Sequence, residues 1–358
     1  MSRRLWIVVG ALIALIATAG SPSGAAADGL PLPIDGATDG AGITSLDGSA
    51  RYATVTTVNR GTARTVLMRI DPDSGAIKDV RHRSGTWSIP LVAYDGTTSG
   101  LSADGARLAL IEPRMAFPRR TTRFAIVDTE RLSVQETVTL DGDFSFDALS
   151  PNGRLMYLIH YLDPRDPSAY EVRAFNLERG ELLADPIVDE DAAPVTMGGY
   201  PQTRAVSPDG RWSYTLYAAN AGHRAPFIHA LDTKTGDAAC IDLDPGVVDP
   251  RKLWRMELVP SADGATLEVV DRAAPVAHVD LGTYEVSEPA PAAEPERGGS
   301  GLLPWLAIGA GIGLLAIVAI MLRRRLVGVT EPLSGAELER MVAGLEPAEE
   351  RREREPVP

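Results

Sequence analysis

The chain has 358 residues, with 35 Lys and Arg against 48 Asp and Glu, which gives a formal net charge of −13 at pH 7. A balance this acidic argues against nucleic-acid binding, which requires a basic stripe or patch. Cys240 is the single cysteine, so the sequence provides neither a disulfide framework nor a cysteine-based metal cluster.

The N-terminus has the pattern of a secretory signal peptide over residues 1–27. Arg3 and Arg4 supply the positive charge, residues 5–19 form an apolar stretch, and Ala25-Ala26-Ala27 offers small residues for cleavage. An uncleaved anchor is the alternative, but this stretch is shorter than the roughly 20 residues that a membrane-spanning helix needs. We therefore expect residues 1–27 to be removed and the remainder of the N-terminal part to be exported.

Residues 28–288 contain a tetrad that recurs five times, with Ser first, Asp or Asn third and Gly fourth. The tetrads occupy 45–48, 102–105, 150–153, 207–210 and 261–264, and their serines are 57, 48, 57 and 54 residues apart. A turn that returns at nearly regular intervals indicates a repeat fold. These residue types suit a short hairpin loop in which Gly adopts the left-handed conformation. We therefore predict one such hairpin between the first and second strands of each repeat.

Each repeat also carries extended runs rich in β-branched and aromatic residues, as strands prefer. Four such strands in about 50 residues predict the blade of a β-propeller. The fourth repeat, with Ser207-Pro208-Asp209-Gly210 followed by Asp232-Thr233-Lys234-Thr235-Gly236, is the clearest. Units of this form resemble the YVTN/YncE-type, WD-repeat-like propeller family.

The expected fold class is all-β, a β-propeller of about five four-stranded blades, plus one C-terminal transmembrane α-helix. Members of the family usually have more than five blades. Either the chain forms a small five-bladed ring or it contains a further, degenerate blade. Residues 31–42 could add a strand that closes the ring.

The sequence after the propeller predicts a membrane anchor. Residues 289–301 are rich in Pro, Ala and Gly and are typical of a stalk. Residues 302–322 contain no charge and are long enough to span a bilayer. Arg323-Arg324-Arg325 follow, and such a cluster marks the cytoplasmic side. We expect a single-pass protein of the cell membrane, with its propeller extracytoplasmic and residues 323–358 in the cytoplasm.

The cytoplasmic tail contains one short amphipathic helix pattern. Ser334 and Glu337 have the spacing of a capping box. The apolar residues that follow fall on one helical face: Leu338, Met341, Val342 and Leu345. Two interpretations stay open, a frayed helix lying near the bilayer and a docking helix for a partner.

No motif assigns catalytic, cofactor-binding or metal-binding residues. The sequence contains no nucleophile elbow or phosphate-binding loop, and its five histidines have no metal-ligand spacing. Residues 141–147 alternate oxygen-bearing side chains as a calcium loop does, but the turn glycine and the closing Glu are missing. We interpret this segment as a polar turn that leads into an inner strand.

The candidate binding residues lie on the loops expected at the mouth of the central channel, where propellers often bind partners. An insertion around residues 112–122 carries a basic cluster in an otherwise acidic domain, which suits an anionic ligand or partner, although a solvated loop is the alternative. The candidates are Arg114, Arg119, Arg120, Arg123, Tyr200 and Arg204. Tyr94 and Trp87 are expected at the same mouth.

These patterns predict a membrane-anchored propeller that binds an envelope protein or ligand, without a cofactor and without nucleic acid. Two alternatives stay open. The family resemblance permits a propeller enzyme, lactonase-like or lyase-like, which would need His, Glu or Asp side chains converging at the channel mouth. The chain could instead be an assembly factor for a membrane complex.

Overall fold

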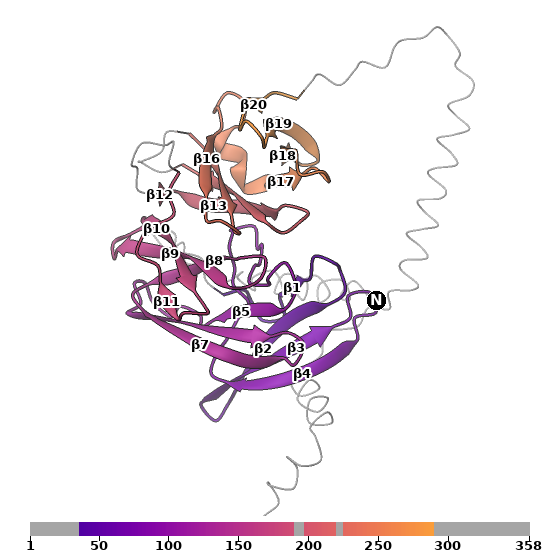
Figure 1. Cartoon of the computed structure of the whole chain (residues 1–358), viewed down its shortest axis with the longest axis vertical. Helices are drawn as coiled ribbons and strands as arrows, with labels where there is room; N and C mark the ends of the chain where they lie inside the picture. The colour runs from indigo at the N-terminus through magenta and orange to yellow at the C-terminus, as the bar shows by residue number, and fades with distance from the viewer. Residues whose placement is uncertain (1–35, 190–196, 220–224, 290–358) are drawn as a thin grey trace, which may run out of the picture.

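The computed structural model describes residues 36–189, 197–219 and 225–289, whose strands form five antiparallel sheets that follow one another in chain order (Figure 1). The first sheet has the order β1-β2-β3-β4, with strands at Gly42–Thr44, Arg51–Asn59, Thr62–Ile70 and Ile77–Ser84. The second sheet consists of β5, β6 and β7, at Arg107–Ile111, Thr121–Asp128 and Ser133–Asp141. An isolated bridge between Leu101 and Leu108 marks the place of its inner strand.

The other three sheets repeat this order. The third consists of β8, β9, β10 and β11, with β12 also paired to β10, at Phe144–Leu149, Leu155–Asp163, Asp166–Asn176, Glu181–Leu182 and Met197–Gly198. The fourth consists of β13, β14, β15 and β16, at Tyr200–Val206, Trp212–Ala218, Phe227–Asp232 and Ala238–Asp242. The fifth consists of β17, β18, β19 and β20, at Met256–Pro260, Thr266–Asp271, Ala274–Asp280 and Val286–Ser287. The 3-10 helix η1 at Pro250–Arg255 precedes it.

The five tetrads make the same turn in every sheet, between the inner strand and the strand beside it. In each, the serine Oγ donates to the side-chain oxygen of the third residue at 2.5–2.9 Å. It also accepts the backbone N–H five residues further on at 2.8–3.0 Å. The fourth-position glycines have φ between 63° and 70°, which costs a glycine little. The predicted hairpin is confirmed, and its side chains are occupied in shaping the turn.

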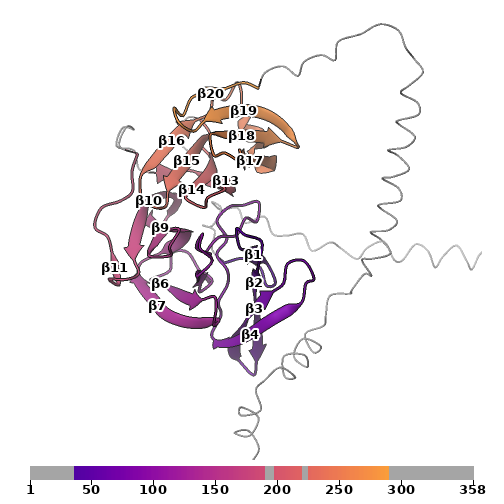
Figure 2. The same ribbon diagram turned by 45° about the vertical axis from the view of Figure 1, so that its right-hand side comes forward.

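Each sheet packs its apolar face against the next, as blades do. One buried cluster joins the first two sheets through Trp87, Ile89 and Leu108. Another joins the second and third, around Phe124, and a third joins the fourth and fifth, around Leu216 and Leu267. Figures 1 and 2 show the sheets arranged along an arc, from the first in indigo to the last in orange. Nearly all of the described structure is β, consistent with a β-propeller.

The first and the fifth sheet, at the two ends of the arc, differ in the composition of their outer faces. The outer face of the first sheet carries an apolar cluster around Ala53, Val66 and Met68. The outer face of the last sheet is mixed and includes Val259 beside Glu268, whose carboxylate lies 3.5 Å from the His278 Nδ1. Among the residues described, no hydrophobic cluster joins the first sheet to the last.

The expected closing strand at residues 31–42 is described only from residue 36 onward. Gly36 forms one isolated bridge with Pro90, and the Gly40 N–H donates to the Thr54 carbonyl at 2.8 Å. These contacts belong to the first two sheets. Residues 36–42 make no strand pairing with the last sheet in the part of the chain that is described.

The predictions for the two chain ends lie outside the described residues. These are the signal peptide at 1–27, the stalk from residue 290, the membrane span at 302–322 and the tail at 323–358 with Leu338, Met341, Val342 and Leu345. Within residues 36–189, 197–219 and 225–289, no helix has the length and apolarity needed to cross a bilayer.

Candidate functional site

A hollow lies at the end of the arc where the inner strands begin, which is the predicted mouth. Its lining comes from the second, third and fourth sheets and the loops before them, and encloses about 30 Å³, enough for one or two waters. Five tyrosines line it: Tyr94, Tyr161, Tyr170, Tyr200 and Tyr217. Tyr94 and Tyr200, which the sequence analysis placed at the mouth, are thus two of the residues that line this hollow.

Three of these tyrosine rings, those of Tyr161, Tyr170 and Tyr217, lie next to one another and form an aromatic wall. The ring centroids of Tyr161 and Tyr170 are 6.3 Å apart, and those of Tyr170 and Tyr217 are 6.2 Å apart. Burial raises the pKa of the Tyr161 and Tyr217 hydroxyls well above the usual range, and raises that of Tyr94 to about 12. These hydroxyls therefore stay protonated at neutral pH and can donate hydrogen bonds.

A buried ion pair between Arg204 and Asp147 lies behind this wall. Arg204 extends from β13 and Asp147 from β8, so the pair links the fourth and third sheets. Their side chains are only 3% and 2% exposed, and the Arg204 Nη2 contacts the Asp147 Oδ1 directly. The Arg204 Nε also donates to the Thr215 Oγ1 at 2.8 Å. The guanidinium is therefore held by the protein itself and not offered to solvent.

Two buried polar atoms beside this pair have no hydrogen-bond partner among the described residues. They are the Asp147 Oδ2 and the His229 Nε2. His229 lies across β14 from Arg204, because Thr215 pairs with both residues in the sheet. Burial lowers the pKa of His229, so its imidazole is neutral at pH 7. Asp147 lines the hollow, whereas His229 lies outside its lining and contacts the Cys240 Sγ through its Nδ1 at 4.0 Å.

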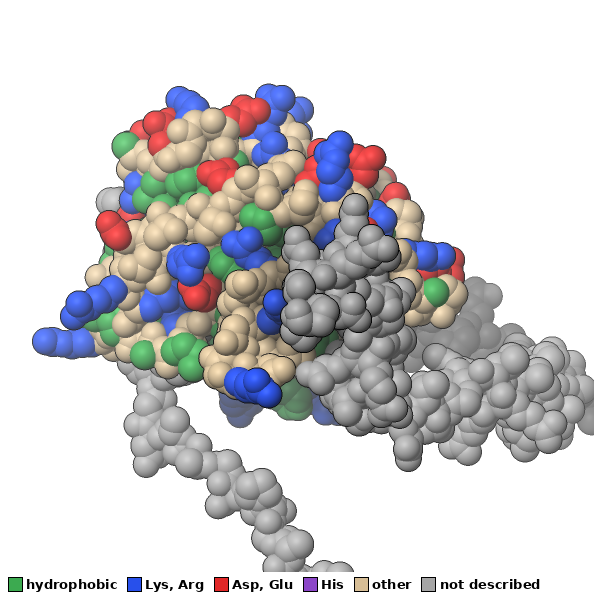
Figure 3. Space-filling view, turned by 90° about the horizontal axis from the view of Figure 1, so that it is seen from below, with side chains coloured by type: hydrophobic (Ala, Val, Ile, Leu, Met, Phe, Trp, Pro, Cys, Tyr) green, Lys and Arg blue, Asp and Glu red, His purple; other side chains and the backbone are tan. Residues whose placement is uncertain are grey.

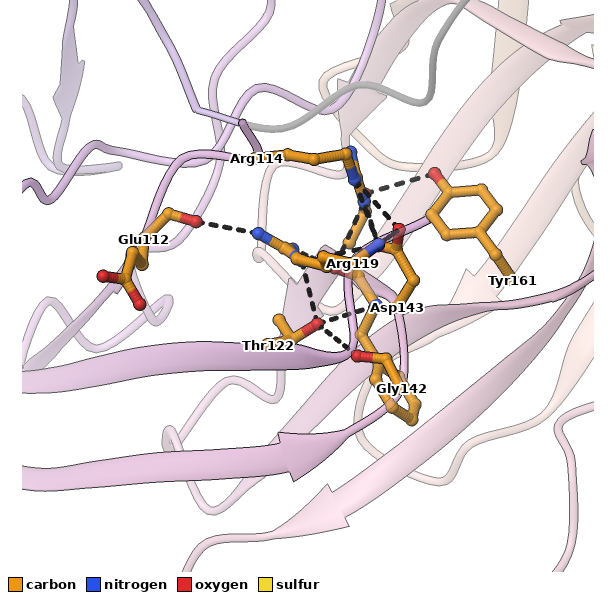
Figure 4. Close-up of polar contacts among 9 residues, drawn as sticks. Glu112, Arg114, Arg119, Thr122, Gly142, Asp143 and Tyr161 are labelled. Atoms are coloured by element: carbon orange, nitrogen blue, oxygen red, sulfur yellow. Dashed lines mark hydrogen bonds and ion pairs between the residues drawn. The ribbon is translucent and has the colours of Figure 1, made fainter. Parts of the chain in front are cut away.

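A second buried charge cluster fixes the β5–β6 insertion over the start of β8 (Figure 4). The Arg114 Nη2 lies 2.6 Å from the Asp143 Oδ1, and the Arg119 backbone N–H donates to the Asp143 Oδ2 at 2.8 Å. The Arg119 Nη1 donates to the Glu112 carbonyl at 2.8 Å. Arg114 also lies over the Tyr161 ring, 5.3 Å from its centroid. The Asp143 carboxylate therefore faces two guanidinium groups, those of Arg114 and Arg119.

The structure separates the predicted arginines into two groups. Arg114 and Arg119 turn inward, with side chains 4% and 11% exposed. Arg123 is half-exposed and lies 3.5 Å from Glu112, and Arg120 is exposed, with its carbonyl accepting the Gly142 N–H at 2.7 Å. The four do not form one free basic patch, because two of them share a buried aspartate.

The expectation that Trp87 lies at the mouth is wrong. Its side chain is 2% exposed and belongs to the core between the first two sheets. Its backbone N–H donates to the Thr65 Oγ1 at 2.8 Å, and its Nε1 donates to the Ser84 carbonyl at 3.0 Å. The segment before the inner strand of the second sheet packs inward here, because a large aromatic side chain gains more from burial than from exposure.

Sequence reasoning did not select Asp143, Asp147, Tyr161, Tyr170 and Tyr217 for the site. The alternation of oxygen-bearing residues in 141–147 was a usable signal for two of them, and its interpretation as a turn into an inner strand is confirmed, because β8 begins at Phe144. The tyrosines lie on ordinary strands, and nothing local distinguishes them. Within the described ranges, no three His, Cys, Asp or Glu side chains are grouped so that they could hold a metal ion.

Comparisons with known proteins identify no family for this chain. No protein-family model matches it, and no curated protein matches it in sequence. Similar solved structures include a hydrazine synthase from Kuenenia stuttgartiensis, at 15% identity and a TM-score of 0.38, over 76% of this chain and 62% of that one. TolB from Acinetobacter baumannii is 14% identical at a TM-score of 0.34, over 71% of this chain and 52% of its own length.

A third similar structure is the Cps50 (Swd1) β-propeller domain from Myceliophteria thermophila. It is 11% identical at a TM-score of 0.38, over 67% of this chain and 64% of that domain. The chain thus spans about half to two thirds of the length of these three structures. The class of protein is given by the five sheets themselves, which have the strand order and stacking of propeller blades.

Proposed function

We propose that this protein is a binding module, a propeller held outside the cell membrane by a single span, whose mouth contacts an envelope protein. One observation carries the proposal. Large apolar side chains are exposed at the mouth end: Val58, Tyr94, Met115, Leu162 and Trp254. They lie on the turns between second and third strands or on the segments that enter inner strands, which meet at this end of every sheet.

These side chains are of the kinds that protein partners bury. Met115 is 94% exposed, at the tip of the β5–β6 insertion, and Trp254 is 67% exposed in η1. Exposed Trp, Tyr and Met are enriched in protein interfaces, where a few such residues supply most of the binding energy. A loop that exposes Met115 while Arg114 and Arg119 fix its base is suited to presenting an apolar contact in a defined position.

The distribution of charged side chains favours a partner that binds at the mouth through apolar contacts over one that binds through charge alone. Figure 3 shows the molecule from below the view of Figure 1, and this face carries both Lys or Arg and Asp or Glu side chains. The predicted basic cluster is itself engaged by Asp143. A partner would therefore bind mainly through apolar and aromatic contacts.

Site-specific photo-cross-linking of the full-length protein in its native membrane tests this function. We expect a photoreactive phenylalanine at Met115 to capture one partner in a defined band, and Met115→Asp to weaken the co-purification of that partner at least tenfold. The matched control is Val259, which is 43% exposed but lies on β17 away from the mouth. Equal capture from both positions, or none from Met115, would contradict the proposal.

A further inference from the structure

The 3-10 helix η1 exposes an aromatic and a basic side chain at the mouth end of the fifth sheet. Side chains three residues apart lie on the same side of a 3-10 helix, so Arg251 and Trp254 share one edge of η1. The Arg251 side chain is 88% exposed and Trp254 is 67% exposed. Leu253 lies on a different edge and is buried. The core therefore fixes the helix in place while Trp254 points into solvent.

The hairpin between β18 and β19 extends this exposed surface. Met256, the first residue of β17, pairs with Asp271, and the Arg255 Nη2 lies 2.6 Å from the Asp271 Oδ2. The end of η1 therefore lies beside the tip of the hairpin, where Arg272 is exposed. Three small apolar residues of the hairpin are exposed as well: Ala273, Ala274 and Pro275. We call the exposed side chains of η1 and of residues 272–275 the η1 surface.

Basic side chains outnumber acidic ones by only one on and around the η1 surface. The basic ones are Arg251, Lys252, Arg255 and Arg272, and the acidic ones are Asp249, Glu257 and Asp271. Asp249 lies 3.1 Å from Arg251 and 3.6 Å from Lys252, so two cations share one carboxylate. Arg272 forms no ion pair with any residue that the structure describes. Attraction to anionic groups is therefore weak, and Trp254 has to supply most of any binding at this surface.

The chain leaves the fifth sheet in the direction of the η1 surface. β19 follows β18 through the hairpin at residues 271–274, so it runs from the mouth end to the tetrad end. β20 is antiparallel to β19, with Val286 opposite Val279, and so it runs back toward the mouth end. Residue 289 is the last that is described here, and residues 290–301 can reach at most about 40 Å. A span at 302–322 therefore favours an approach of the bilayer from the mouth end.

We propose that the η1 surface docks the fifth sheet on the outer leaflet of the membrane, with the Trp254 ring among the lipid headgroups. An indole suits this interface, because its ring is apolar and its N–H can donate a hydrogen bond. The basic side chains beside it can contact lipid phosphates. The inference rests on the membrane anchor of the proposed function. It assigns Trp254 to lipid and leaves Met115, on the second sheet, for the partner.

Fluorine NMR of the full-length protein in nanodiscs tests this docking with no partner present. The protein is labelled with 5-fluorotryptophan, and the nanodiscs contain phosphatidylcholine and phosphatidylglycerol, with or without a lipid that carries a nitroxide on its headgroup. We expect the nitroxide to broaden the Trp254 resonance, which is assigned by its loss in Trp254→Phe. Trp212, at the tetrad end of the fourth sheet, should stay sharp. Trp305, in the expected span, reports insertion of the anchor in the same spectrum.

Charge reversal gives a second readout that leaves the tryptophan in place. Lys252→Glu together with Arg272→Glu should reduce the broadening at Trp254 at least about twofold, because both changes place negative charge against anionic lipid. The matched control is Arg131→Glu together with Lys234→Glu, which changes the net charge equally on exposed turns at the tetrad end. The control pair should leave the broadening at Trp254 unchanged.

The docking and the anchor can fail separately in this experiment. The docking is overturned if the nitroxide broadens Trp305 and leaves Trp254 sharp, or if it broadens Trp254 no more than Trp212. Broadening of neither Trp254 nor Trp305 would contradict both the docking and the anchor. Broadening of Trp254 without Trp305 would support the docking and contradict the anchor. A sharp Trp254 in nanodiscs, with capture of a protein from the same position in native membranes, would assign the η1 surface to the partner instead.

Discussion

Two buried aspartates determine the electrostatics of the mouth at the scale of single residues. Asp143 is 3% exposed and Asp147 is 2% exposed, and each lies against at least one guanidinium group. A carboxylate this deeply buried is tolerated only when it is paired. The first role of Arg114, Arg119 and Arg204 is therefore to compensate these charges and to fix neighbouring sheets to one another.

The Arg204–Asp147 pair gives a prediction about stability. Arg204→Met leaves Asp147 buried without its counter-ion, which should lower the free energy of unfolding by about 3–5 kcal/mol. Arg204→Met combined with Asp147→Leu removes both charges and should recover a large part of that loss. Chemical denaturation of the single and double variants measures both values. Losses that simply add would show that the pair is not coupled.

Sequence reasoning located the arginines but could not pair them. Asp143 is 29 residues from Arg114, and Asp147 is 57 residues from Arg204, and no local pattern links such positions. Their pairing depends on how two sheets stack, which only the three-dimensional fold provides. The same reason explains Trp87, whose inward position depends on Thr65 in the neighbouring sheet.

At the scale of elements, the tetrad turn is the feature that made the repeat fold recognisable from the sequence. Its glycine, its serine and its acidic or amide residue each have a local role, so its five copies could be recognised without knowledge of tertiary contacts. The strands beside them were equally recognisable from β-branched and aromatic runs. The second sheet departs from four full strands, because the segments beside β5 pair with it through two isolated bridges, between Ser88 and Ile111 and between Leu101 and Leu108.

The first tetrad gives a prediction about how the stability of the fold changes at acidic pH. The Asp47 carboxylate accepts hydrogen bonds from the Ser45 hydroxyl and from the backbone and hydroxyl of Ser49, which lowers its pKa to about 2. A pKa lowered by folding gives stability that is present above the unfolded pKa of about 3.9. That stability is lost as the pH falls from about 4 to about 2.

Asp47→Asn removes this titration and keeps the acceptor, as Asn152 does in the third tetrad, where the Ser150 Oγ donates to it at 2.9 Å. We expect the Tm of Asp47→Asn to change less between pH 4 and pH 2 than that of the wild type, measured by circular dichroism. The control is Asp73→Asn, on the exposed turn after β3, which should keep the wild-type dependence. Identical pH dependence of Asp47→Asn and the wild type would contradict the assignment.

The molecule as a whole has two distinct ends. The mouth end holds buried charge pairs behind a tyrosine wall, whereas the other end is formed by the five tetrad turns. The stacked sheets join these two ends. Blade stacking could be anticipated from the repeat, but the exposed positions at the mouth depend on insertions that differ from repeat to repeat and follow no pattern.

The proposed function depends on which side of the membrane the sheets occupy. Residues 1–27 and 302–322, with the arginines at 323–325, predict that the sheets lie outside and the tail inside. An envelope partner can reach the mouth only in that orientation. The position of the sheets relative to the bilayer is therefore the central claim.

The most direct test is labelling of intact cells with a membrane-impermeant maleimide. In a Cys240→Ser background, one variant carries Asp73→Cys on the exposed turn after β3 and another carries Glu350→Cys in the tail. The orientation proposed here predicts that the first cysteine is labelled in intact cells and the second only after the membrane is permeabilised. Labelling of Glu350→Cys in intact cells, with Asp73→Cys protected until permeabilisation, would contradict it.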